Sequence, residues 1–219
     1  MRETWLRDLK GAEYRFFLGG PPSAMPDAED DCVYLFCSDA YDKLPTKTRA
    51  AMQWAVAKDY DHVFKCDDDT YVRPDRLLAS GFEEFGYTGF TEGRFHSSGS
   101  AMQVYAYAQG GAGYWLGRKA MQLVADNEGT HYCEDCGVGI TLGVNGISPI
   151  HDTRYAPQVG PLELEYPDSR RNLITLHKVS PDQMRRLYAA DQKEKANAYS
   201  HQVDGSSAGF TLRPCPQHD

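Results

Sequence analysis

"YDHVFKCDDDTYVR", residues 60–73, places three consecutive aspartates directly after a short apolar run. The run at residues 62–66 is typical of a buried strand, whereas three adjacent carboxylates repel one another and favour water. In parallel α/β sheets, ligands gather at the carboxyl ends of the strands. Asp67, Asp68 and Asp69 are therefore candidates for a divalent-cation and diphosphate site, because hard cations take oxygen ligands. A solvated acidic turn is the alternative that this segment alone leaves open.

Other chemistries of acidic or glycine-rich motifs do not fit the sequence. An aspartyl-phosphate motif, DxDx(T/V) counted from Asp67, fails because its last position holds Tyr71. The chain contains no G-x-x-x-x-G-K-[ST], which argues against P-loop nucleotide hydrolysis. The spaced ligands of an EF-hand calcium loop are also absent.

Apolar runs alternate with helical patterns along the chain, which predicts an α/β fold with a mainly parallel central sheet flanked by helices. We expect strands at residues 14–18, 32–37, 62–66, 87–90, 102–107 and 172–177, and helices at 46–59, 73–81, 118–127, 133–146 and 180–193. Residues 109–117 are expected to form a glycine turn, and residues 91–101 a flexible loop. The prediction is a domain over residues 1–192 and a polar, mobile tail over 193–219.

The overall charge and hydropathy limit the partners that the chain can have. A net charge of −8 and a pI near 5.3 argue against a nucleic-acid groove as the main surface. No stretch approaches the roughly 18 uninterrupted apolar residues of a membrane span. We therefore expect membrane association only through a segment that this chain does not contain.

The cysteines give no clear framework. Six are irregularly spaced: Cys32, Cys37, Cys66, Cys133, Cys136 and Cys215. The single C-x-x-C pair, Cys133 and Cys136, has no second pair or neighbouring histidine pair, and is therefore weak evidence for zinc. A disulfide and two thiols both remain open.

Six short blocks occur in one order along the chain. They are RETW at 2–5, FFLG at 16–19, YDKLPTKT at 41–48, KCDDDTYV at 65–72, GGAGYWLGRKA at 110–120 and CEDCGVG at 133–139. This series resembles the β-1,3-glycosyltransferases of family 31, of the Fringe and core-1 galactosyltransferase type, over about residues 2–190. The resemblance implies a GT-A fold and an inverting transfer of a hexose-type sugar, such as galactose or N-acetylglucosamine, from a UDP-sugar to a glycan hydroxyl. Mn²⁺ is the implied cofactor.

Carried over by position, the triple aspartate corresponds to the family's DxD motif. Asp69 would ligate the metal directly, while Asp67 and Asp68 would hold the ribose, the donor sugar or the metal and its waters. A histidine would complete the site: His177 is the first choice by resemblance, and His151 is the alternative. The metal would offset the negative charge that grows on the departing UDP.

The resemblance assigns two further groups. Inversion by direct displacement needs a general base for the acceptor hydroxyl, and the family's acidic block places Asp135 there, with Glu134 orienting it or binding the acceptor. The alternative for both acids is that they favour a helix N-terminus.

The donor side would include three residues outside the aspartates. Gly110 and Gly111 would allow the backbone to approach the donor sugar closely, and a plain turn is the alternative. Lys47 would meet a phosphate or be solvated.

The chain departs from the family at its start, where an apolar first strand is expected upstream of RETW. If the chain is a fragment of a type II membrane protein, the Golgi lumen is the expected location; otherwise a soluble cytoplasmic protein is expected. A catalytically inactive or truncated relative that binds glycans or nucleotide sugars is the alternative function. Keeping both the triple aspartate and Glu134-Asp135 favours the enzyme.

Overall fold

The protein is represented by a computed structural model that describes residues 1–20, 30–98, 101–129, 133–158 and 172–205. The longest helices in the described residues are α1 (Leu44–Ala57), α3 (Arg118–Asp126), α4 (Glu134–Val144) and α6 (Pro181–Gly205). The short helices are η1 (Trp5–Asp8), η3 (Tyr41–Lys43), α2 (Pro74–Leu78) and η4 (Phe82–Glu84). The described residues contain both helices and strands, which confirms a mixed α/β class.

The largest sheet has the order β3-β8-β5-β9 and is mixed. Its strands are β3 (His62–Lys65), β8 (Tyr114–Gly117), β5 (Tyr87–Gly89) and β9 (Ile150–His151). The strand β8 runs antiparallel to both β3 and β5, and only β5 and β9 pair in parallel. The sheet is therefore not the mainly parallel one expected from the sequence, because a reversed strand lies between two strands that point the same way.

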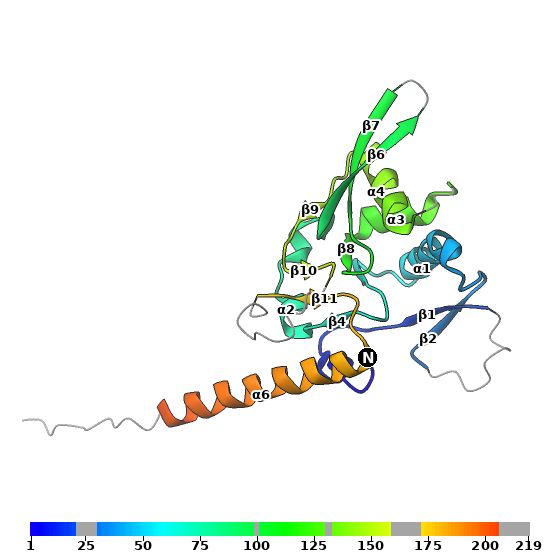
Figure 1. The fold of residues 1–219 in the computed structure, drawn as a ribbon. Helices are drawn as coiled ribbons and strands as arrows, with labels where there is room; N and C mark the ends of the chain where they lie inside the picture. Colours follow the sequence, from blue (N-terminus) through cyan, green and yellow to red (C-terminus); the bar gives the residue numbers. More distant parts are fainter. Residues whose placement is uncertain (21–29, 99–100, 130–132, 159–171, 206–219) are drawn as a thin grey trace, which may run out of the picture.

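The remaining strands form three smaller sheets. The strands β1 (Phe16–Gly19) and β2 (Cys32–Leu35) pair in parallel. The strands β10 (Tyr155–Ala156), β11 (Thr175–Leu176) and β4 (Tyr71–Val72) form a mixed sheet. The strands β6 (Thr91–Ser98) and β7 (Ala101–Ala108) form an antiparallel hairpin that rises from the body in Figure 1. The prediction of a flexible loop over residues 91–101 is wrong, because β6 occupies most of this segment.

The strand β8 divides the core into two layers. Tyr114 and Leu116 belong to the apolar cluster against α1, α3 and α4. Trp115, between them, points into the second cluster, which contains Trp5 and Tyr71. Successive side chains of a strand point to opposite faces, so β8 is buried on both sides. The prediction of a turn over residues 109–117 is therefore wrong for residues 114–117, which form this strand.

The long helix α6 begins with reciprocal capping. The backbone N–H of Gln183 donates to the Ser180 hydroxyl, while the backbone N–H of Ser180 donates to the Gln183 side chain. The helix continues to Gly205, past the expected boundary at residue 192, and extends away from the body (Figure 1). The two-part division of the chain stays a prediction. No helix among the described residues has the length and apolarity to cross a membrane.

Buried ionic contacts hold α6 to the body. The Arg73 guanidinium donates from Nε to Asp191 Oδ2 at 2.6 Å and from Nη2 to Asp191 Oδ1 at 3.1 Å. The Tyr71 hydroxyl donates to Asp191 Oδ2 at 3.0 Å. Both carboxylate oxygens of Asp191 are therefore hydrogen-bonded, as the burial of this group requires.

Candidate functional site

The aspartates follow β3 directly, as the sequence predicts, and two of them meet a histidine from the far end of the chain. His177 Nε2 lies 3.2 Å from Asp69 Oδ1 and 3.8 Å from Asp67 Oδ2. One ligand atom from each of the three residues lies within 4.8 Å of the others. The loop after β3 and the end of β11 therefore bring together the three residues that the sequence analysis names first as metal ligands.

His177 is oriented by its backbone surroundings. Its Nδ1 lies 3.0 Å from the Pro157 carbonyl oxygen, which can only accept, so Nδ1 carries a proton. The other ring nitrogen, Nε2, then faces the two carboxylates. Gly111 allows this placement, because a Cβ there would lie 2.0 Å from His177 Cε1. The glycine predicted for close approach therefore makes room for a side chain of the site itself.

The Asp69 carboxylate turns one oxygen to the His177 ring, 3.2 Å from Nε2, a contact that is ionic only when the ring is protonated. Its Oδ1 is buried and accepts no hydrogen bond, although the side chain as a whole is 48% exposed. A buried carboxylate oxygen without a donor is costly. A divalent cation among Asp69, Asp67 and His177 would satisfy it, and the two carboxylates are ligands that suit Mn²⁺. The residues present therefore fit the implied metal.

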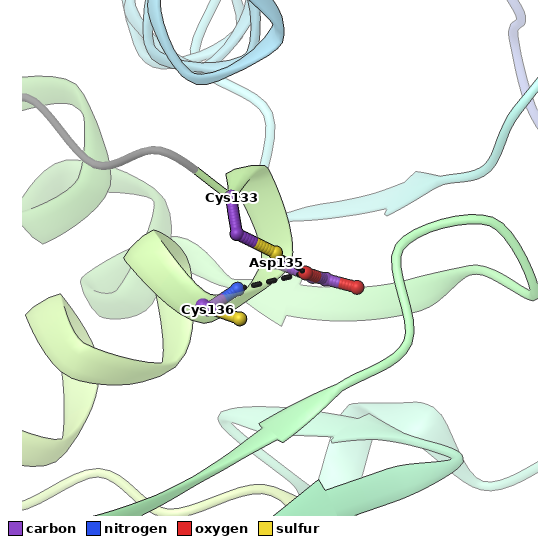
Figure 2. Close-up of side chains that lie close together, drawn as sticks. All are labelled: Cys133, Asp135 and Cys136. Carbon is purple, nitrogen blue, oxygen red and sulfur yellow. Dashed lines mark hydrogen bonds between the residues drawn. The ribbon is translucent and has the colours of Figure 1, made fainter. Parts of the chain in front are cut away.

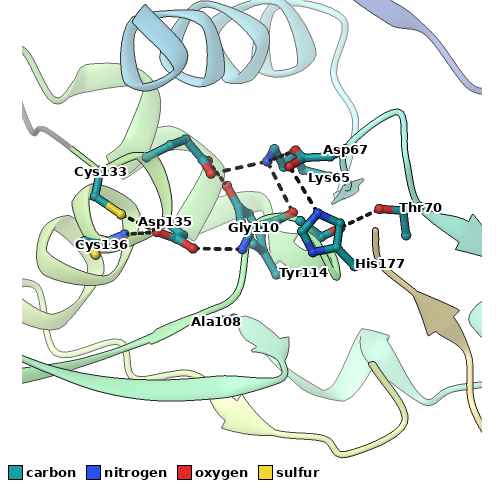
Figure 3. A network of polar contacts seen from close by, with 12 residues as sticks. Lys65, Asp67, Thr70, Ala108, Gly110, Tyr114, Cys133, Asp135, Cys136 and His177 are labelled. Atoms are coloured by element: carbon teal, nitrogen blue, oxygen red, sulfur yellow. Dashed lines mark hydrogen bonds and ion pairs between the residues drawn. The ribbon is translucent and has the colours of Figure 1, made fainter. Parts of the chain in front are cut away.

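Lys65 links the aspartates to the acidic start of α4, a role that the sequence analysis missed. Its ammonium donates to Asp67 Oδ1 at 2.8 Å, to Glu134 Oε2 at 3.2 Å and to the Gly110 carbonyl at 3.2 Å (Figure 3). Burial lowers the pKa of Lys65, but the Glu134 and Asp67 carboxylates outweigh this effect and raise it above its ordinary value. One signal was present in the sequence: residues 65 and 67 lie two apart, and strand alternation turns them to one side.

The pKa of Asp67 shows the same coupling from the other side. Burial acts to raise it, but the charge and hydrogen bond of Lys65, with smaller contributions from His177 and Lys47, lower it below its ordinary value. Asp67 is therefore a carboxylate at neutral pH, the form that binds a cation.

Glu134 and Asp135 begin α4 and are held by different donors. The Tyr114 hydroxyl donates to Glu134 Oε1 at 2.5 Å, and burial, followed by the Glu134 charge, raises the Tyr114 pKa. Asp135 Oδ2 accepts the Gly110 backbone N–H at 3.1 Å, and Asp135 Oδ1 accepts the Cys136 N–H at 2.9 Å. Both acids thus occupy a helix N-terminus and also face the turn that contacts Lys65.

The turn between β7 and β8 connects the two acidic groups. Gly110 gives its N–H to Asp135 and its carbonyl to Lys65, and a Cβ at Gly110 would lie 2.5 Å from Glu134 Oε2. The Gly111 carbonyl accepts the Thr70 hydroxyl at 2.6 Å. Of the glycine turn expected at residues 109–117, the part before β8 is present, and it ties the aspartate loop to the start of α4 (Figure 3).

Three other predicted site residues are Asp68, Lys47 and His151. Asp68 is exposed. Lys47 pairs with Asp39 at 2.5 Å, and Asp39 also accepts the Gly19 backbone N–H. His151 Nδ1 lies 3.0 Å from the Thr91 backbone nitrogen, in an edge contact with Phe90. In the part of the chain that the structure describes, His177 rather than His151 joins the aspartates.

Comparisons with known proteins agree with the sequence blocks. The galactosyltransferase family model matches residues 1–84, which include the triple aspartate. A probable beta-1,3-galactosyltransferase 13 of Arabidopsis thaliana is 33% identical over 108 residues, covering 40% of this chain and 31% of that protein. The matched part therefore spans about a third of that relative. Both matches support the resemblance stated above: residues 1–84 are similar to the galactosyltransferase family, and the Arabidopsis relative is a probable beta-1,3-galactosyltransferase.

Proposed function

We propose that the protein is an inverting, metal-dependent glycosyltransferase of GT-A fold that moves a hexose-type sugar from a UDP-sugar to a glycan hydroxyl. The name of the Arabidopsis relative supports galactose as the sugar and β-1,3 as the linkage. One observation carries the proposal: the buried Asp69 Oδ1 has no hydrogen-bond donor and faces His177 Nε2, in a loop joined through Lys65 to the candidate base region.

The donor would bind on the aspartate side of the network. Asp69, Asp67 and His177 would hold Mn²⁺, which would supply Lewis-acid stabilisation of the UDP leaving group. Asp68 is solvent-accessible and can accept hydrogen bonds from the donor's hydroxyls. Lys47 contributes positive charge near Asp67 and suits a phosphate contact. Gly110 and Gly111 keep the facing turn free of side chains.

Asp135 would act as the general base on the acceptor side. Backbone N–H groups of Gly110 and Cys136 fix its two oxygens in place. Oδ1 also accepts the Cys133 thiol, whereas Oδ2 keeps a second lone pair that can accept a proton. Glu134 is engaged by Tyr114 and Lys65 and is therefore suited to positioning rather than to proton transfer. Lys65 balances the charge of Glu134 and Asp67, so that both acids can be ionised in the same site.

The test is UDP release across a panel of UDP-sugars, with Mn²⁺ or with EDTA, on the wild type and on Asp135→Asn. We expect metal-dependent release that falls about 10²- to 10⁴-fold in Asp135→Asn, the usual contribution of a general base. Binding of UDP with Mn²⁺ should survive the substitution, because Asp135 does not contact the aspartate–histidine cluster.

The other results of this test are equally specific. Metal-dependent UDP binding without turnover on any acceptor would favour the inactive or truncated binding module. No UDP binding at all would contradict the assignment of the triple aspartate to a nucleotide sugar.

A further inference from the structure

Two cysteines and the candidate base converge at the start of α4 (Figure 2). Cys133 is the residue before the helix, and Asp135 and Cys136 lie in its first turn. One ligand atom from each lies within 4.8 Å of the others, and all three residues are partly exposed. Both cysteines are thiols rather than a disulfide. The structure thus adds a carboxylate oxygen to a C-x-x-C pair that was weak evidence for zinc by sequence alone.

The donor atoms of this group define the kind of cation that it suits. Two thiolates and one carboxylate prefer zinc-like, thiophilic divalent ions, whereas Mn²⁺ favours oxygen ligands. Zinc sites have Zn–S distances of about 2.3 Å and Zn–O distances of about 2.0–2.2 Å. Ligand atoms already within 4.8 Å of one another can reach such a centre by side-chain rotation. Three protein ligands would leave a fourth position for water.

The surroundings of the three ligands orient the Asp135 carboxylate and offset part of the negative charge of the ligands. The Gly110 and Cys136 backbone N–H groups hold Asp135, as outer partners of a metal ligand commonly do. The Cys133 thiol already donates to Asp135 Oδ1 at 2.7 Å, so sulfur and oxygen face the same point. Two thiolates and a carboxylate exceed a divalent charge by one unit, and the positive end of α4 would offset part of that excess.

We propose that Cys133, Asp135 and Cys136 form a binding site for a thiophilic divalent cation of the zinc class. Binding displaces the two thiol protons to solvent and places the cation on the Asp135 carboxylate. An Asp135 that ligates a cation cannot take a proton from an acceptor hydroxyl. Occupancy therefore inhibits transfer, a consequence that rests on the proposed function, whereas the binding itself does not.

The binding test uses the full-length reduced chain and Cd²⁺, whose bonds to thiolates give an ultraviolet charge-transfer band. We expect the band to saturate at one Cd²⁺ per chain and to be erased by Zn²⁺ but not by Mn²⁺. The band should be lost in Cys133→Ser/Cys136→Ser and kept in Cys32→Ser/Cys37→Ser, which removes the same number of thiols elsewhere. Asp135→Asn should weaken Cd²⁺ binding about tenfold or more.

Several results would overturn the site. They are a band that survives in Cys133→Ser/Cys136→Ser, an affinity unchanged in Asp135→Asn, or a Cys133–Cys136 disulfide in protein purified without reductant that resists mild reduction. Circular dichroism of each variant separates a lost site from a lost fold. None of these readouts needs turnover. If UDP release is absent but the cadmium band behaves as expected, the proposed function fails and the cation site stands.

Discussion

Two buried cation–carboxylate networks in this molecule differ in how completely their polar atoms are satisfied. Arg73 and Asp191 form a closed pair, in which a two-pronged guanidinium and the Tyr71 hydroxyl cover both carboxylate oxygens. Lys65 instead shares one ammonium between Asp67 and Glu134, while neighbouring Asp69 keeps an oxygen without a donor.

This difference distinguishes a structural ion pair from a candidate ligand-binding site. In the Arg73–Asp191 pair both carboxylate oxygens already have donors, and the pair holds α6 beside β4. The Lys65 network is open on the side of Asp69 and His177, where carboxylate oxygens and a ring nitrogen converge within 4.8 Å. A buried carboxylate oxygen that accepts no hydrogen bond is therefore the feature that indicates ligand binding here.

The largest effect on stability is expected from Arg73→Met. This change leaves Asp191 buried without its cation, and removing one partner of a buried pair costs about 3–5 kcal/mol. Urea unfolding followed by circular dichroism measures it. The substitution should leave Mn²⁺ affinity unchanged in the folded protein; a loss of metal affinity would mean that the two networks are coupled.

Lys65→Met should cost less, about 1–3 kcal/mol, because Asp67 is partly solvated and Glu134 keeps the Tyr114 hydroxyl. Mn²⁺ with UDP should stabilise this variant at least as much as the wild type, since a cation at Asp67 restores positive charge beside it. Mn²⁺ with UDP should raise the free energy of unfolding of Arg73→Met by the same amount as that of the wild type. A smaller increment in Lys65→Met than in the wild type would contradict the open network.

The smallest effect concerns acid unfolding without metal. Lys65 lowers the folded-state pKa of Asp67, so the Asp67 carboxylate contributes stability above its unfolded pKa of about 3.9. That contribution is lost as the pH falls through the lower folded-state value. Asp67→Asn should therefore narrow the stability difference between pH 5 and pH 2, measured by urea unfolding at intervals of about half a pH unit. An unchanged profile would show that Lys65 does not couple to Asp67.

The sequence predicts the elements better than their arrangement. Periodicity locates α1 and α4 within about two residues, and the short run before the aspartates identifies β3. The strand β8 is missed because YWLG lies between glycines and continues into a helix, so a short buried strand looks like a turn. Missing β8 also produces the wrong sheet, since this strand reverses the direction between β3 and β5.

The candidate site is predicted in its residue types but not in its connections. Acidic residues and a histidine can be selected from the sequence because few side chains suit a hard cation. Lys65 is not selected, because a lysine in a short strand normally indicates an exposed position. Its role depends on Glu134 lying 69 positions away, and only the fold supplies that contact. Cys133 and Cys136 likewise become candidate ligands only when the fold brings an Asp135 oxygen within 4.8 Å of both sulfur atoms.

The most direct test of the metal site is calorimetric titration of UDP, with and without Mn²⁺, into the wild type and Asp69→Asn. Metal-dependent UDP binding is expected in the wild type, weakened at least about tenfold in Asp69→Asn, which corresponds to about 1.4 kcal/mol. The free energy of unfolding without metal should not fall in this variant, because Asn carries no negative charge and can place its NH2 group where the unpartnered oxygen lies. Equal UDP binding by both proteins, or binding that ignores Mn²⁺, would contradict a metal–nucleotide site at Asp67, Asp69 and His177.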